Sequence, residues 1–212
     1  MQKFFKNKKN ACPQCLKHSF CRRGFTLVET LVAISIFSIS ILGLLSVLAS
    51  GITSTTYAKN KIIAGYLAQE GIEYVRNMRD TFVLYDYDSN GNPIGWASFI
   101  NKITPCETTK GCFFDDSSVP FSIPSNMAMK NLTLNPCSSA TCPNGLLLYN
   151  SSTGEYGYAN NGTSSGFVRK VWMIPNNLNP SNEIQIFSEV SWTQGSGNYN
   201  ITFSENLFNW VQ

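Results

Sequence analysis

The first strong pattern in the chain is a continuous apolar run over residues 25–50, built almost entirely of Leu, Ile, Val, Phe, Ala and Ser. Its single ionisable residue is Glu29. About 20 apolar residues in a helix are enough to cross the hydrocarbon core of a bilayer. An ordinary cleaved signal peptide has a shorter apolar stretch that ends in a small-residue cleavage site. The run therefore predicts a membrane-spanning helix.

Beyond Ser50 the helical period continues, but the pattern becomes amphipathic. Apolar residues recur at steps of three and four, the spacing of one helix face: Ile62, Ile63, Tyr66, Leu67, Tyr74, Val75 and Met78. The opposite face carries Lys59, Lys61, Glu73 and Arg76. We therefore predict one helix over residues 25–79, about 80 Å long at 1.5 Å per residue. Because it is too long for one membrane crossing, its second half must pack on a soluble domain.

From residue 80 onward the helical period disappears and turn-forming residues become frequent. Residues 184–192 and 199–207 alternate between apolar and polar side chains, with Gly195 and Gly197 between the two segments. This pattern predicts an antiparallel hairpin, and residues 167–174 predict a third strand. We expect residues 150–166 to form a surface loop. The predicted fold class is α+β, with a long N-terminal helix packed on a small antiparallel β-sheet in residues 80–212.

The charge is distributed unevenly along the 212 residues. The whole chain has a formal net charge of +3, but residues 1–24 contain seven basic side chains and no acidic one. The remainder holds nine basic against 13 acidic residues, a net charge of −4. The basic block lies where a processing or topology signal lies, so net charge gives little support to a nucleic-acid partner.

The seven cysteines divide in the same way as the charge. Three precede the apolar run, and four follow it, namely Cys106, Cys112, Cys137 and Cys142. If the positive flank of the run is cytoplasmic, the four later cysteines face an oxidising compartment. Two disulfides are then expected there. The spacing favours the local pairs Cys106 with Cys112 and Cys137 with Cys142, although four cysteines allow three connectivities.

The junction between the basic block and the apolar run reads RRGFTLVE over residues 22–29. This segment resembles the processing site of type IV pilins and type II secretion pseudopilins. In that resemblance Arg22 and Arg23 end the basic leader, Gly24 precedes the cut, and Phe25 becomes the new, N-methylated first residue. Glu29 matches the acid that follows at a fixed spacing. The order of basic leader, glycine, phenylalanine, acid and membrane helix makes the match specific.

Each of these residue types has a physical reason to occupy its position. Gly24 has no Cβ, so the backbone at the cut can lie extended in a protease groove, and Arg22 and Arg23 hold it at the cytoplasmic face. A carboxylate such as that of Glu29 costs about 2.5 kcal/mol or more at mid-bilayer depth. The resemblance supplies its partner, the α-ammonium of Phe25 on a neighbouring subunit. A compatible alternative is an acid that stabilises the first helical turn.

The resemblance implies a precursor whose leader, residues 1–24, is removed by a prepilin peptidase. Its other implied partners are further pilin subunits, in a homo- or heteropolymer, and the inner-membrane assembly machinery. It implies a single-pass protein of the cytoplasmic membrane, with a cytoplasmic N-terminus, that enters an extracellular filament. The late strands, with Trp192 and Trp210, also look like minor-pilin family members. The alternative is a membrane-tethered binding module that does not polymerise, but such an anchor gains nothing from Glu29.

Two weaker motifs suggest metal binding. Asp86, Asp88 and Asn90 place oxygen atoms on alternate residues like the opening of a calcium loop, but Ala97 stands where the closing glutamate belongs. We interpret the segment as an acidic turn, with calcium as the weak alternative.

In the leader, the cluster Cys12, Cys15, His18 and Cys21 has soft-ligand chemistry, but two-residue intervals leave little room around a tetrahedral zinc ion. We therefore expect no cofactor. His18 is the only histidine and lies in the leader, so the mature chain would have none. A Ser-His-Asp or Cys-His apparatus would then be absent, and we do not expect an enzyme.

Overall fold

The computed structural model describes residues 24–107, 110–115, 132–158, 162–175 and 182–210. Arg22, Arg23 and the leader cysteines and histidine lie outside these residues. The chain divides into two compact units, Met1–Gly51 and Ile52–Gln212, of which the second contains all the β-structure.

The long helix α1 spans Leu27–Tyr85. It begins two residues later than predicted because Thr26 caps it: the Thr26 Oγ1 accepts a hydrogen bond from the backbone N–H of Glu29 at 3.2 Å, and the Thr26 carbonyl accepts the bond from Thr30. It ends six residues later than the predicted Arg79, because Thr81 and Val83 are also buried. The last turn therefore continues the face that packs on the globular core.

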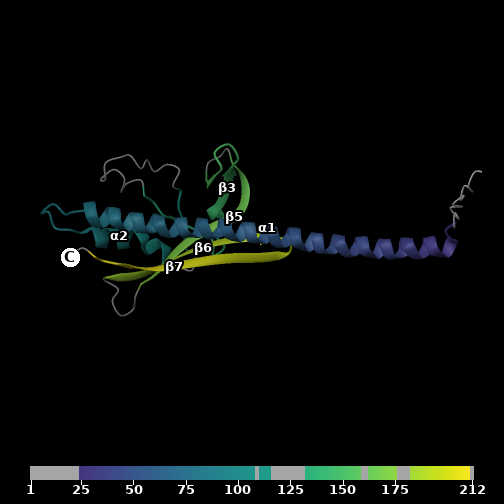
Figure 1. The fold of residues 1–212 in the computed structure, drawn as a ribbon. Coiled ribbons are helices and arrows are strands. Elements are labelled where there is room, and N and C mark those ends of the chain that lie inside the picture. Colours follow the sequence, from purple (N-terminus) through teal and green to yellow (C-terminus); the bar gives the residue numbers. More distant parts are fainter. Residues whose placement is uncertain (1–23, 108–109, 116–131, 159–161, 176–181, 211–212) are drawn as a thin grey trace, which may run out of the picture. The chain divides into compact units, whose positions relative to one another are not determined.

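The second half of α1 lies along three long antiparallel strands (Figure 1). These are β5 (Thr163–Pro175), β6 (Glu183–Gln194) and β7 (Gly197–Phe208). β6 and β7 pair without interruption from Glu183 with Phe208 to Gln194 with Gly197. Their two-residue turn contains Gly195 at a φ of +59°, a conformation that glycine adopts without strain. The predicted hairpin is confirmed.

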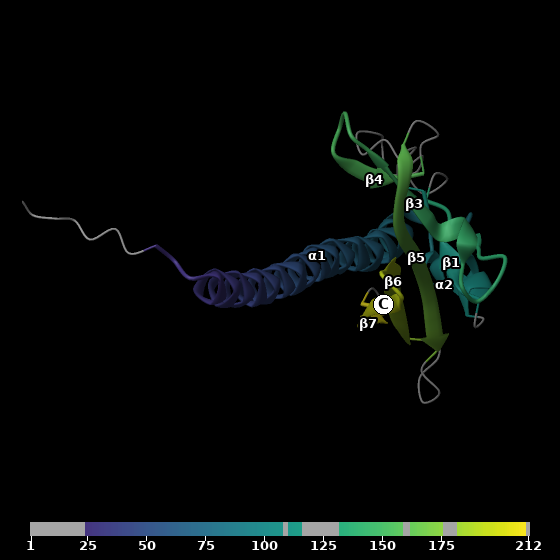
Figure 2. The ribbon, with the colours of Figure 1, turned by 90° about the vertical axis from the view of Figure 1, so that its right-hand side faces the viewer.

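Short elements complete the globular unit. They are α2 (Gly95–Ile103), the 3₁₀ turns η1 (Thr104–Cys106) and η2 (Pro143–Gly145), and the strands β1 (Cys112–Phe113), β2 (Asn135–Pro136), β3 (Leu146–Asn150) and β4 (Glu155–Gly157). β6 pairs with one edge of β5, whereas β1 and β3 share the other edge (Figure 2). The expected loop over residues 150–166 was partly wrong, since it contains β4 and the start of β5. That stretch is polar and Gly-rich, so its strands have no alternating pattern.

The core confirms the predicted α+β arrangement. Alternate residues of β5 and β6 are buried beneath α1, as expected for a sheet with one covered face. One cluster includes Tyr74, Val75, Met78, Phe99, Met173 and Ile186; a second joins Ala64, Leu67, Ala68, Leu147, Phe167, Val190 and Trp192. Gly71 lets the helix approach closely, because a Cβ there would lie 2.2 Å from the Ser188 Oγ.

A charged side chain is enclosed in this interface. Arg169 on β5 is fully buried, and its Nη1 donates to the Glu70 Oε2 of α1 at 2.6 Å. Its guanidinium carbon lies 3.9 Å from the centroid of the Phe114 ring, a cation–π contact. Glu70 is the more accessible partner, with 38% of its side chain exposed.

Candidate processing and membrane-anchoring segment

The candidate cleavage residues lie just before the helix and are exposed. Phe25 is 79% exposed. Among the described residues other than Gly24 and its chain neighbours, no atom lies within 4 Å of the position that a Cβ on Gly24 would occupy. Packing against these residues therefore does not explain glycine at this position.

Glu29 lies in the first turn of α1. The Thr26-x-x-Glu29 spacing is that of a capping box, and the hydrogen bond to the Thr26 Oγ1 supplies one of its two contacts. The positive end of the helix dipole stabilises a carboxylate at this point. The structure thus accommodates the first-turn role, and the role of Glu29 in assembly stays a prediction.

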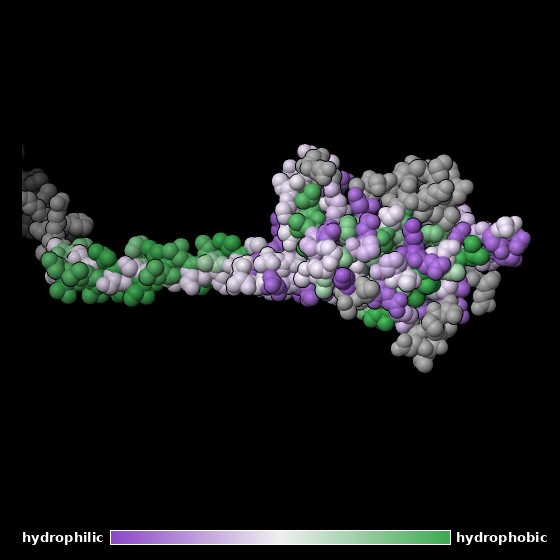
Figure 3. All heavy atoms as spheres, turned by 180° about the vertical axis from the view of Figure 1, so that it is seen from behind, coloured by the Kyte–Doolittle hydropathy of each residue, from purple (hydrophilic) through white to green (hydrophobic). Residues whose placement is uncertain are grey.

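The helix of the first unit presents apolar side chains on all sides. Large exposed ones occur throughout residues 25–48 and include Phe25, Leu31, Ile34, Phe37, Leu42, Leu44 and Val47. Figure 3 shows the apolar surface of this helix, in green, from one side. α1 is long and apolar enough to cross a membrane, and its most apolar window is unburied. Burial away from water stabilises such an apolar surface.

Three serine hydroxyls of this segment are satisfied within the helix. The hydroxyls of Ser35, Ser38 and Ser40 each donate to the carbonyl four residues earlier, at 2.8 Å. Unsatisfied polar groups are costly in hydrocarbon, and this back-bonding removes that cost for the serines. Glu29 is the only side chain of residues 25–50 that can carry a charge.

Residues 20–45 match the family model of the prokaryotic N-terminal methylation motif. The chain carries the type IV pilin and pseudopilin signature. The matched residues include Gly24, Phe25 and Glu29. The signature supports a pilin-like precursor with a structural rather than an enzymatic role, and it suggests membrane anchoring. No curated protein and no solved structure matches the chain.

The globular unit contains two disulfides, Cys106–Cys112 and Cys137–Cys142. The structure thus shows the local pairing. The first one links η1 to β1, which pairs with β5 through Val171, and the backbone N–H of Cys137 donates to the Gly111 carbonyl. Since β1 and β2 are only two residues long, the covalent links compensate for their few ladder hydrogen bonds.

The weak calcium candidate forms a turn. The Asp88 Oδ1 accepts hydrogen bonds from the backbone N–H groups of Asn90 and Asn92, both at 2.8 Å, and its Oδ2 accepts one from the Asn92 side chain. These bonds, led by those from Asn92, lower the pKa of the Asp88 carboxyl. In the described part of the chain no group of three or more acidic, histidine or cysteine side chains could hold a metal ion. The contacts of Asp88 are those of an Asx-type turn.

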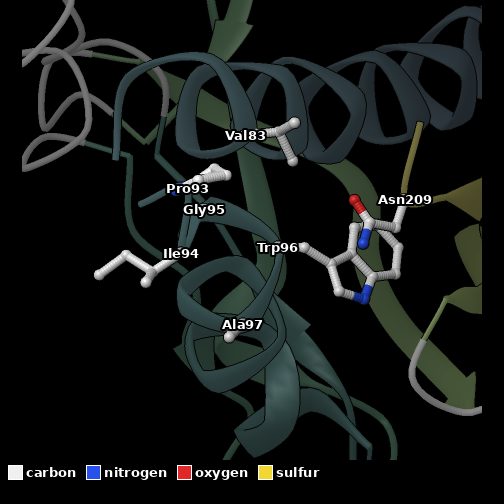
Figure 4. A pocket seen from close by; sticks show the side chains of 7 residues that line it. All are labelled: Val83, Pro93, Ile94, Gly95, Trp96, Ala97 and Asn209. Atoms are coloured by element: carbon white, nitrogen blue, oxygen red, sulfur yellow. The ribbon is translucent and has the colours of Figure 1, made fainter. Parts of the chain in front are cut away.

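A pocket of about 250 Å³ lies beside the start of α2. Figure 4 shows the Trp96 indole and the Asn209 amide side by side, opposite Val83 and Pro93. Its seven lining residues carry no charge, so the pocket lacks the groups for acid–base chemistry. The sequence did not indicate this pocket, because Trp96 and Asn209 are distant in the chain and belong to no motif.

Proposed function

We propose that this chain is the precursor of a structural subunit, a minor pilin or pseudopilin, of a type IV pilus-like filament. The observation that carries the proposal is the methylation motif at the start of a helix whose apolar surface is exposed all round. A prepilin peptidase cuts between Gly24 and Phe25, and the new terminus is N-methylated. The leader arginines Arg22 and Arg23 keep the junction at the cytoplasmic face.

Assembly follows from the chemistry of the new terminus. Cleavage creates an α-ammonium on Phe25, four residues before the carboxylate of Glu29. In lipid that carboxylate costs about 2.5–3.5 kcal/mol at mid-bilayer depth. The ammonium of a neighbouring subunit neutralises it, so insertion beside that neighbour is favoured and the register of the two helices is fixed. The apolar surface passes from lipid to the helices of other subunits.

The proposed topology places the N-terminus in the cytoplasm and the globular unit outside. The basic leader favours that orientation, and the two disulfides are typical of an oxidising compartment. The division into a leader of residues 1–24, a helix from residue 25 whose first half spans the membrane, and an extracytoplasmic domain is part of the same proposal. The partners are the prepilin peptidase, other pilin subunits and the inner-membrane assembly machinery.

Mass spectrometry of the protein isolated from membranes of its native host tests the proposal. The expected product begins at Phe25 and carries one additional methyl group on its α-amino group. A product that retains Met1, or one cut near Ser50, would rule out prepilin processing. Replacing Gly24 with Leu should leave the precursor uncut, because the side chain obstructs the extended backbone in the protease groove. The control is Gly43→Leu, whose glycine also has open space around it.

A further inference from the structure

A groove of about 560 Å³ lies on the globular unit, lined by α1, β3, β4 and β5. This volume is within the range of small-ligand sites. Figure 2 shows β3 and β4 beside the long strand β5. None of its lining residues belongs to residues 20–45, which carry the methylation motif, and the proposed assembly makes no use of them.

Aromatic rings form one part of the groove. The centroids of Tyr149 and Tyr156 are 5.0 Å apart with their planes tilted by 46°, and Tyr156 meets Phe167 edge-on at 6.0 Å. Phe167 is buried, whereas the two tyrosines are half-buried. Burial and the neighbouring Tyr149 raise the pKa of Tyr156 above its ordinary value. The phenol therefore stays protonated at neutral pH and remains a hydrogen-bond donor.

Polar groups line the rest of the groove. Asn60 donates through its Nδ2 to Gln194 at 3.1 Å, which leaves its carbonyl oxygen as an acceptor. Within the part of the chain that the structure describes, neither the Tyr149 nor the Tyr156 hydroxyl makes a hydrogen bond. Lys59 is exposed and is the one charged residue in the lining. The groove thus combines ring faces, uncharged donors and acceptors, and one cation.

We propose that this groove binds an acidic sugar, a pyranose ring that carries a carboxylate. The C–H face of such a ring packs on a tyrosine ring, its hydroxyls exchange hydrogen bonds with phenol and amide groups, and its carboxylate pairs with Lys59. A nucleic acid fits less well, because its affinity comes from several basic contacts to phosphates and the groove offers one. An acidic peptide would use the same cation but has no ring face for the tyrosines.

The test is titration of the full chain in detergent micelles with trigalacturonate, followed by calorimetry and by saturation transfer from protein to sugar protons. Maltotriose serves as the neutral sugar and triglutamate as the acidic peptide. We expect trigalacturonate to bind more tightly than both. Lys59→Gln should weaken its binding about fivefold, the range of an exposed ion pair. Tyr149→Ala should weaken it about tenfold through the loss of ring contact.

Lys61→Gln is the matched control, since Lys61 is also exposed on α1 but does not line the groove. It should leave the affinity unchanged. Circular dichroism of each variant checks that the fold is intact. Three results would each overturn the proposal: no binding of trigalacturonate, equal binding of triglutamate, or binding that Lys59→Gln and Tyr149→Ala leave unaltered.

Discussion

The buried Arg169 predicts an unusual order of mutant stabilities. Removing the carboxylate with Glu70→Ala leaves the guanidinium enclosed between α1 and the sheet without its counter-ion. Breaking a fully buried pair in this way costs about 3–5 kcal/mol. Because 38% of the Glu70 side chain is exposed, solvent screens part of the interaction, and we expect about 2–3 kcal/mol.

Replacing the arginine should cost less than replacing its partner. Arg169→Met loses the contact with Phe114, worth about 2 kcal/mol when desolvated. It also removes two buried donors, Nε and Nη2, that have no hydrogen-bond partner among the described residues, and each such donor costs about 1–3 kcal/mol. Removing both donors recovers about 2–6 kcal/mol, which at least offsets the lost contact with Phe114, and the half-exposed Glu70 carboxylate remains hydrated. In the double variant Glu70→Ala/Arg169→Met, stability should therefore recover relative to Glu70→Ala.

Urea unfolding in detergent, followed by tryptophan fluorescence, measures the free energy of unfolding of the unchanged chain, the two single variants and the double variant. Glu73→Ala is the control on the same helix, since Glu73 pairs with Arg76 at 2.6 Å but is 51% exposed; it should cost less than about 1 kcal/mol. If Glu70→Ala costs no more than this control, or the double variant is less stable than Glu70→Ala, the guanidinium does not depend on that carboxylate.

Three further predictions concern assembly, redox state and pH. Glu29→Ala should leave processed protein in membranes at a normal level but reduce its recovery in sheared filaments, whereas normal recovery would remove the assembly role of Glu29. Non-reducing peptide mapping of the mature protein should recover both local disulfides, and four free thiols would reverse the proposed topology. The Asp88 turn should be intact above pH 3.8, the ordinary pKa of its carboxyl, and open as the pH falls through the lowered pKa. NMR of the Asn92 amide should follow this opening; an unchanged signal at low pH would mean that the carboxylate does not hold the turn.

Sequence patterns predicted the elements with regular periods and missed those that depend on distant contacts. The period of 3.6 residues indicated α1, and strict alternation indicated the β6–β7 hairpin. Arg169 occupies an inward position between Phe167 and Val171, where the alternation called for an apolar residue. Its partner Glu70 is 99 residues away, so only the packing of helix on sheet brings the two together. The groove beside Tyr156 was missed for the same reason, since its walls come from four separate elements.

The cap at Thr26 bears on the proposed cleavage between Gly24 and Phe25. The Thr26 side chain and carbonyl accept the first helical hydrogen bonds. Among the described residues, no helical hydrogen bond therefore crosses the junction between Gly24 and Phe25. The proposed hydrolysis of that peptide bond therefore needs no unwinding of α1. In the proposed processing, the hydrogen bonds of α1 are the same before and after removal of the leader, so the shortened subunit starts assembly with this helix already formed.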